Sequence, residues 1–215
     1  METLTVNDIP EMFESVASLF AEKKDELCEM DAAMGDGDLG LTMSKGYGAL
    51  PGFLRDSAGE GDVGKQLAKA AMKMQNEVPS TMGTLMSSGI LSAGKALRGK
   101  VALEPKDLAT FAEAFAEGIR KRGKCELGDR TILDSVDAAA KAARDSVITF
   151  SGPGFLMVAS TAAGGAAEGV EATKDMVPKF GKAAVHVAKA KGVADQGAVA
   201  GYYLYLGIKN YFERH

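Results

Sequence analysis

Residue types that often carry catalytic or metal chemistry are scarce in this chain, which has two cysteines and two histidines among 215 residues. Cys28 and Cys125 lie far apart without the paired spacing of a zinc site, which favours free buried thiols over a disulfide. His186 and His215 stand beside no serine or cysteine nucleophile motif. Triad-type nucleophilic catalysis is therefore set aside.

Long apolar runs and basic runs are missing as well. No stretch approaches the roughly 20 apolar residues of a membrane-spanning helix, and residues 1–5 lack the basic and apolar regions of a secretory signal. The formal net charge is −4, and residues 121–124 hold only a small basic cluster. These absences argue against nucleic acid and membrane as partners and predict a cytoplasmic protein.

Alternation of the β-strand type is almost absent, whereas helical periodicity runs through the chain. Met12, Val16, Leu19 and Phe20, for example, fall on one helical face. The pattern predicts eight helices, near 8–28, 39–50, 62–77, 80–98, 106–121, 130–145, 154–173 and 195–213. Short breaks favour antiparallel neighbours, and many Ala and Gly residues permit close helix approach. Length and composition predict one soluble all-α domain over residues 1–215.

Residues 174–194 do not follow this helical scheme. The segment contains five lysines and is bounded by Pro178 and Gly192. A loop of this length in a compact domain is usually functional or disordered, and its lysines suit a mobile cover over an anion. A short amphipathic helix with exposed lysines is the alternative.

Three carboxylates crowd eight positions of a glycine-rich stretch, at Asp31, Asp36 and Asp38. Such groups repel one another unless their pKa values rise or a hard cation such as Mg²⁺ binds them. Gly35 and Gly37 permit the tight turn that points them to one side. An EF-hand is excluded, because the twelfth loop position is Tyr47 rather than glutamate. A solvated loop is the alternative to a metal site.

Four further segments have the Gly, Asp and hydroxyl content of a phosphate site, and each precedes a predicted helix. They are residues 79–84, 123–131, 152–154 and 195–198. Unpaired N–H groups and a partial positive charge at a helix N-terminus can cradle phosphate oxygens. For any one segment alone, ordinary helix capping is the stronger interpretation. There is neither a Walker A sequence nor a strand-embedded G-x-G-x-x-G motif.

Three blocks taken together resemble the nucleotide-binding L subunit of dihydroxyacetone kinases. They are Asp31-x-x-x-Gly35-Asp36-Gly37-Asp38-x-Gly40-x-x-Met43, Arg122-Gly123-Lys124 followed by Gly128-Asp129-Arg130-Thr131-x-x-Asp134, and Asp195-x-Gly197-Ala198. The resemblance implies a closed barrel of eight antiparallel amphipathic helices. It also implies that ADP or ATP binds at one end of the barrel through two Mg²⁺ ions.

The resemblance further assigns roles to single residues. Asp31, Asp36 and Asp38 are the implied Mg²⁺ ligands, and Lys189 is the implied cation that neutralises charge during transfer. The implied nucleotide-contacting residues are Leu39, Thr42, Ser80, Thr81, Met82, Gly83, Gly123, Ile132, Lys189, Asp195 and Gly197. Several depart from the family pattern: Leu39 and Thr42 stand for His and Asn, Pro79–Gly83 for a glycine-rich loop, Gln196 for proline and Lys189 for arginine.

In that family a separate K subunit binds the keto-sugar, so the resemblance implies a kinase half that works with such a partner. Dihydroxyacetone is the default substrate, and a four-carbon ketose stays open. The phosphoryl donor is either ATP or a protein of the phosphotransferase system, and a homodimer stays open. The alternatives are a non-catalytic nucleotide-binding regulator and the nucleotide domain of a system resembling fatty-acid kinases.

Overall fold

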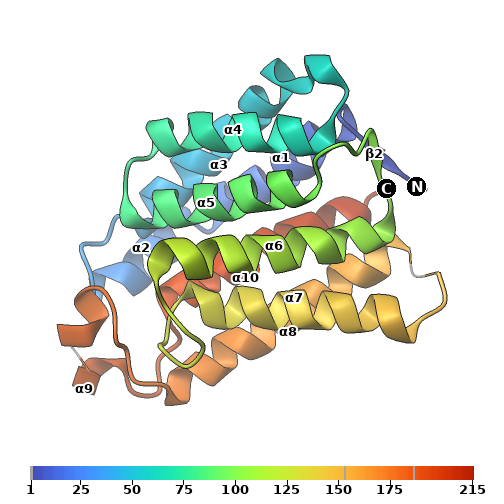
Figure 1. Ribbon diagram of the computed structural model, residues 1–215. Coiled ribbons are helices and arrows are strands. Elements are labelled where there is room, and N and C mark those ends of the chain that lie inside the picture. The colour runs from blue at the N-terminus through green and yellow to red at the C-terminus, as the bar shows by residue number, and fades with distance from the viewer. Residues whose placement is uncertain (1, 153, 186) are drawn as a thin grey trace.

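Long helices make up most of the structure (Figure 1). The computed structural model describes residues 2–152, 154–185 and 187–215. The long helices are α1 Asp8–Glu22, α2 Lys24–Ala32, α3 Leu39–Asp56, α4 Val63–Glu77, α5 Thr81–Ala96, α6 Pro105–Gly123, α7 Ile132–Thr149, α8 Phe155–Ala172 and α10 Gln196–Phe212. The prediction of an all-helical fold is confirmed.

The only strands among the described residues form a short antiparallel ribbon. Strand β1 is Leu4–Thr5 and β2 is Ala102–Leu103, with Leu4 opposite Leu103. Single helical turns complete the element list: η1 Ala58–Glu60, η2 Thr173–Asp175, η3 Lys182–Val185 and α9 Val187–Ala190. The ribbon ties the N-terminal segment to the chain that enters α6.

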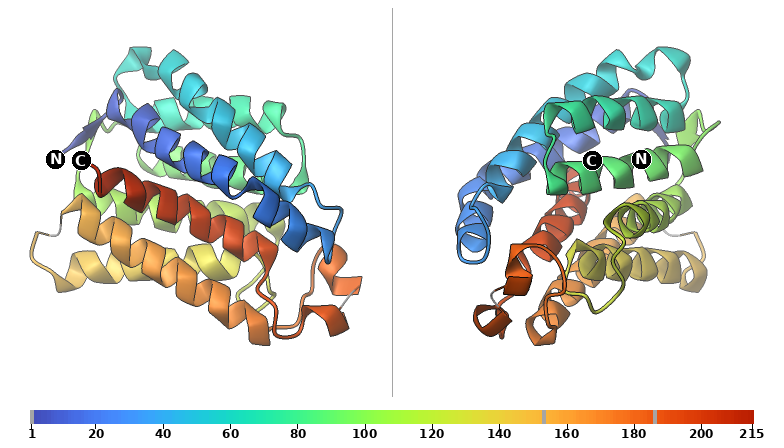
Figure 2. Two further views of the ribbon diagram at one scale, coloured as in Figure 1. Left: turned by 180° about the vertical axis from the view of Figure 1, so that it is seen from behind. Right: turned by 60° about the vertical axis from the view of Figure 1, so that its left-hand side comes forward.

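Consecutive long helices pack side by side, and α10 lies against α1, α7 and α8 (Figure 2). Aromatic rings fill the core, as in the stack of Phe20 on Tyr47 with centroids 4.5 Å apart. Glycine brings α7 and α8 close together, because a Cβ at Gly165 would lie 2.6 Å from the carbonyl oxygen of Ala138. The predicted use of small residues for close helix approach is confirmed here.

Two predicted helix boundaries are wrong. The predicted helix 8–28 is broken at Lys23, and α2 turns toward α3 and α10, where Glu26 accepts a hydrogen bond of 2.5 Å from the Tyr203 hydroxyl. The helix predicted to end at residue 50 continues through Pro51 to Asp56. It continues because Leu50 and Leu54 share one buried face, whose burial outweighs the hydrogen bond that proline removes.

The segment 174–194 is neither a plain loop nor one amphipathic helix. Its described residues form the end of η2, then η3 and α9, with irregular chain between η2 and η3 and after α9. Among the described side chains of this segment, two lysines are engaged with carboxylates, since Lys174 pairs with Glu171 at 2.7 Å and Lys179 pairs with Asp129 at 2.6 Å. The prediction that all five lysines cover an anion is therefore wrong for these two.

Four connections gather at one end of the helices, which lies on the left in Figure 1. They are the α2–α3 and α4–α5 links, the α6–α7 loop and the segment between α8 and α10. We call this the loop end; both chain termini and the β-ribbon lie at the opposite end, the terminal end. Within the described part of the chain, no helix combines the length and apolarity needed to cross a membrane.

Candidate functional site

The three predicted metal ligands come together at the loop end. One carboxylate oxygen each from Asp31, Asp36 and Asp38 lies within 4.8 Å of the others. Asp31 lies in the last turn of α2 and is buried, Asp36 lies in the loop and is exposed, and Asp38 is the exposed residue that precedes α3. Three oxygen donors at this separation fit a hard divalent cation such as Mg²⁺.

Backbone N–H groups of the same loop orient Asp31. Its Oδ2 accepts hydrogen bonds from the N–H of Gly37 at 2.9 Å and of Asp38 at 3.1 Å. The loop can wrap around the carboxylate because Gly37 has φ of +78°, which a side chain would disfavour. A Cβ at Gly35 would collide with Asp31 Oδ1. The two predicted glycines thus hold Asp31 in place.

A cavity of about 450 Å³ lies between the starts of α5 and α7. It brings together four predicted nucleotide-contacting residues, Ser80, Thr81, Gly123 and Ile132. The remaining lining residues are Pro79, Thr84, Leu85, Arg122, Cys125, Thr131, Phe180 and Gly181. Phe180 and Gly181 reach the cavity from the segment between α8 and α10, which was predicted as a cover over an anion, although neither residue was itself a predicted contact.

Helix capping explains part of the hydroxyl content at the cavity. Ser80 Oγ accepts a 3.0 Å hydrogen bond from the N–H of Gly83, as expected for an N-cap. Thr84 N–H is bonded to the Ser80 carbonyl, so the N–H groups of Thr81 and Met82 precede the first intrahelical bond. Capping and anion binding are compatible at this terminus, because these two groups remain at its tip.

The start of α7 is held by a reciprocal cap. Thr131 N–H donates to Asp134 Oδ2 at 2.7 Å, while Thr131 Oγ1 accepts from the N–H of Leu133 at 3.2 Å. The other Asp134 oxygen accepts from Gly128 N–H at 2.6 Å. This predicted Gly-Asp-Arg-Thr block therefore folds the α6–α7 loop and sets Ile132 against the cavity.

The start of α10 links the carboxylates to the cavity. Gln196 Nε2 donates to Asp31 Oδ1 at 3.3 Å, and a Cβ at Gly197 would lie 3.4 Å from the backbone nitrogen of Ile132. Asp195 caps the helix by accepting from Ala198 N–H at 2.9 Å. Burial raises the pKa of the Asp195 carboxyl to about 6.

Two neighbouring residues hold the segment between α8 and α10. Asp129 Oδ1 receives the Lys179 ammonium at 2.6 Å, and this ammonium lowers the pKa of the Asp129 carboxyl. Arg130 is buried and donates to the carbonyl oxygens of Val193 at 2.9 Å and Ala190 at 3.4 Å. The sequence flagged both residues as part of a motif but predicted no such role for them.

A family model matches most of the chain. Residues 33–210 match the model described as the DAK2 domain. The chain belongs to the DAK2 domain family.

Among curated relatives of this DAK2 domain, human triokinase/FMN cyclase is 29% identical over 191 residues, which cover 88% of this chain and 32% of the relative. The ADP-binding subunit DhaL of the PEP-dependent dihydroxyacetone kinase of Escherichia coli K12 is 28% identical over 183 residues, covering 85% of each chain. The chain thus spans about a third of the length of the triokinase relatives it matches.

Among solved structures, the DAK2 domain resembles the dihydroxyacetone kinase from C. freundii in complex with AMP-PNP and Mg²⁺. The TM-score is 0.68 at 21% identity, and the match covers 94% of this chain and 33% of the other. At this identity the likeness supports the fold.

Two other predicted contacts in the DAK2 domain, Leu39 and Thr42, do not line the cavity. The Leu39 side chain is buried in the hydrophobic core, so only its backbone lies near the carboxylates. Thr42 is half-buried one turn into α3, and its N–H donates to the Asp38 carbonyl at 2.9 Å. The Lys189 side chain lies outside the described residues, so its assignment stays a prediction.

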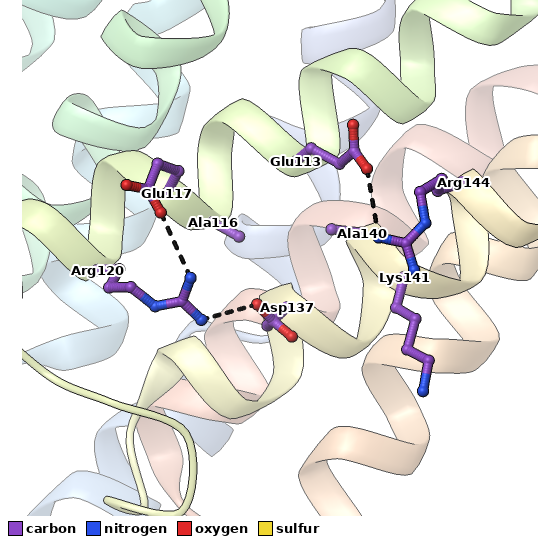
Figure 3. Close-up of a pocket in the computed structure, with 8 residues that line it drawn as sticks. All are labelled: Glu113, Ala116, Glu117, Arg120, Asp137, Ala140, Lys141 and Arg144. Carbon is purple, nitrogen blue, oxygen red and sulfur yellow. Dashed lines mark hydrogen bonds and ion pairs between the residues drawn. The ribbon is translucent and has the colours of Figure 1, made fainter.

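A second cavity of the DAK2 domain, about 330 Å³, lies between α6 and α7 (Figure 3). Arg120 donates to Asp137 at 3.1 Å across this groove, and Arg144 lies 3.6 Å from Glu113. None of its lining residues belongs to the predicted site. We call it the α6–α7 groove.

Proposed function

We propose that this chain is the nucleotide-binding part of a dihydroxyacetone-type kinase. The observation that carries the proposal is the juxtaposition of three oxygen ligands, Asp31, Asp36 and Asp38, with a cavity lined by Ser80, Thr81, Gly123 and Ile132. The start of α10 touches both. ADP or ATP, bound with two Mg²⁺ ions as the family resemblance implies, matches this pairing of a carboxylate cluster with a cavity.

In this proposal the chain positions the nucleotide and shields its reacting end. Bound Mg²⁺ supplies positive charge to the phosphate oxygens and orients the terminal phosphoryl group. Asp31, held by two backbone N–H groups, is the preorganised ligand, and the exposed Asp36 and Asp38 complete the set. The N-terminus of α5 offers N–H donors to the phosphates. The cavity between α5 and α7 takes the base.

We propose a separate K subunit, which holds a short ketose, as the partner at the loop end. Exposed apolar side chains at this end support a docking surface. They are Leu41, Leu127, Val177, Phe180 and Val193. Dihydroxyacetone is the proposed substrate, and its hydroxyl receives the phosphoryl group.

Two finer features belong to the same proposal. The eight helices α1, α3 to α8 and α10 form a closed barrel, which is supported by the packing of each on the next and of α10 on α1. They act as one cytoplasmic domain. For the phosphoryl donor, the name of the E. coli relative favours a PEP-dependent system acting on bound ADP.

A reconstituted transfer assay tests the function. The chain is mixed with a purified bacterial K subunit, dihydroxyacetone and Mg²⁺, and dihydroxyacetone phosphate is followed by ³¹P NMR. One arm supplies ATP, and the other supplies ADP, phosphoenolpyruvate and the phosphotransferase proteins. Product in either arm that disappears with Asp36→Asn supports the proposal. Product that persists in Asp36→Asn contradicts the metal assignment, and no product in either arm contradicts the kinase role.

A further inference from the structure

Arg130 is the most deeply buried cation among the described residues, with a side chain that is 0% exposed. Its Nη1 lies 3.4 Å from Asp195 Oδ1. Its Nη2 donates to the Val193 and Ala190 carbonyls and lies 4.0 Å from the sulfur of Met34. One guanidinium thus reaches two stretches that are far apart in the sequence, the loop at Met34 and residues 190–195.

Each of these stretches belongs to the loop end described above. Met34 sits in the carboxylate loop, between Asp31 and Asp36, and packs on Ala190 in a small apolar cluster of its own. Ala190 and Val193 lie in the segment that also brings Phe180 to the cavity. Asp195 caps α10, and Gln196, the first residue of α10, contacts Asp31.

The arrangement has features that stability alone does not favour. A buried charge has a large desolvation cost, which one carboxylate at 3.4 Å offsets only in part. The Nε of Arg130 has no hydrogen-bond partner among the described residues. The backbone is also strained, because Arg130 has φ of +59°, a region that L-residues with side chains rarely adopt. Strain of this kind clusters at functional sites.

We propose that Arg130 is a positioning residue that couples the carboxylate loop 31–38 to the segment 187–195. The coupling is mechanical: the guanidinium holds two carbonyls of the segment while it packs on the loop through Met34. Ordering of one segment therefore orders the other. The inference rests on the proposed function only for the identity of the ligand, a Mg²⁺ nucleotide, that uses this coupling.

The adjacent residue provides a matched comparison. Asp129 holds the segment between α8 and α10 at a point nearer to α8, through Lys179, whose side chain is 64% exposed. This pair contacts neither the carboxylate loop nor α10 in the described structure. Exposed pairs of this kind contribute little to stability. Loss of Lys179 should release residues 176–181 alone, whereas loss of Arg130 should release two segments at once.

Hydrogen exchange of backbone amides, measured without nucleotide, tests the coupling in Arg130→Lys and in the control Lys179→Met. Lysine keeps a charge beside Asp195 but lacks the planar fork that reaches two carbonyls together. We expect exchange in 31–38 and 187–193 to quicken together, by roughly tenfold, in Arg130→Lys only. An increase confined to one segment, or none, overturns the proposal. Arg130→Gln is the second variant if lysine prevents folding.

The same measurement with Mg²⁺ and ADP separates this inference from the proposed function. In the natural chain the ligand should slow exchange in both segments, and in Arg130→Lys it should slow only 31–38. Such a selective loss is not expected from general destabilisation, which thermal unfolding of each variant reports. Equal slowing of both segments in Arg130→Lys overturns the coupling. If Mg²⁺ and ADP do not change amide exchange in the natural chain, the proposed function is contradicted. The exchange measured without nucleotide still tests the role of Arg130.

Discussion

The two ends of the helices use buried charge in different ways. Of the six charged side chains that are buried in the described structure, five lie at the loop end: Asp31, Asp129, Arg130, Asp134 and Asp195. The sixth, Asp107, lies at the terminal end, where it accepts from Glu104 N–H at 2.8 Å and pairs with Lys100 at 3.1 Å.

At the terminal end, polar groups complete helix ends and tie adjacent connections to them. Asp62, for instance, accepts from Lys65 N–H and from Gly99 N–H, each at 3.0 Å. At the loop end, Asp134 and Asp195 also complete the starts of helices, whereas Asp31, Asp129 and Arg130 hold neighbouring segments in place. Caps therefore identify a fold, whereas a concentration of buried charge beside exposed carboxylates identifies a site.

The largest effect is expected when the same charge is removed from each end. Asp36→Asn should weaken binding of ADP in the presence of Mg²⁺ by roughly 100-fold or more, because loss of even an outer-shell partner typically costs about 10–100-fold. Asp62→Asn removes the same charge at the terminal end while keeping an oxygen that can cap α4. Calorimetric titration of ADP with Mg²⁺ into both variants measures the two affinities. If the two variants bind ADP with equal affinity, the loop end has no special role in nucleotide binding.

Burial of Asp195 predicts an unusual pH dependence at the loop end. Because its folded pKa of about 6 exceeds the usual value of about 3.9, its stabilising contribution is present at low pH and lost as pH rises through 6. Relative to Asp195→Asn, the natural chain should lose about 2 kcal/mol of unfolding free energy between pH 4.5 and 7.

Urea unfolding at several pH values measures this difference. Asp129→Asn is the control of opposite sign, because the Lys179 ammonium lowers the pKa of Asp129. The stabilising contribution of Asp129 is present above the pKa that this carboxyl has in the unfolded chain. It is lost as the pH falls through the lower pKa of the folded protein. If the difference in unfolding free energy between the natural chain and Asp195→Asn did not change with pH, the Asp195 carboxyl would not be strongly desolvated.

A cap at the terminal end should affect stability alone. Asp62→Ala removes the acceptor for Lys65 N–H and should lower the free energy of unfolding by about 1 kcal/mol. The affinity for ADP with Mg²⁺ should stay unchanged, since Asp62 lies at the opposite end from the carboxylates. Denaturant unfolding measures the stability and calorimetry measures the affinity for ADP, both on one preparation. A coupled loss of affinity would show that the ends are not independent.

The smallest effect is expected in the α6–α7 groove, away from both sets of caps. Arg144 and Glu113 are about half exposed and 3.6 Å apart, a geometry in which an ion pair is worth about 0–1 kcal/mol. Arg144→Gln should therefore change the free energy of unfolding by less than about 0.5 kcal/mol and leave nucleotide binding intact. A large change in binding would make this groove a second functional site.

The long helices and the carboxylate cluster were predictable from periodicity and local motifs. The apolar stripes located the long helices, and the Asp-Gly spacing located the carboxylate cluster, because both depend on residues close together in sequence. The break at Lys23 and the passage of α3 through Pro51 were not predictable, since long-range packing decides them. Leu39 was a predicted contact, but its side chain joins the core.

The cavity and the Arg130 contacts show the same limit. Ser80, Thr81, Gly123 and Ile132 were predicted from family resemblance, and the structure gathers them. Phe180 joins them only because its segment folds back from a distant part of the chain. The contact between Arg130 and Val193 spans 63 residues, and no local pattern encodes such a hydrogen bond.

Calorimetric titration of ADP into the metal-stripped protein, with and without Mg²⁺, is the decisive test of the nucleotide site. A spectroscopic check first establishes that no nucleotide is already bound. We expect binding that requires Mg²⁺, and slower amide exchange in residues 31–38 once the complex forms. Absence of binding to folded protein, or equal binding without the metal, would contradict a nucleotide site built on Asp31, Asp36 and Asp38.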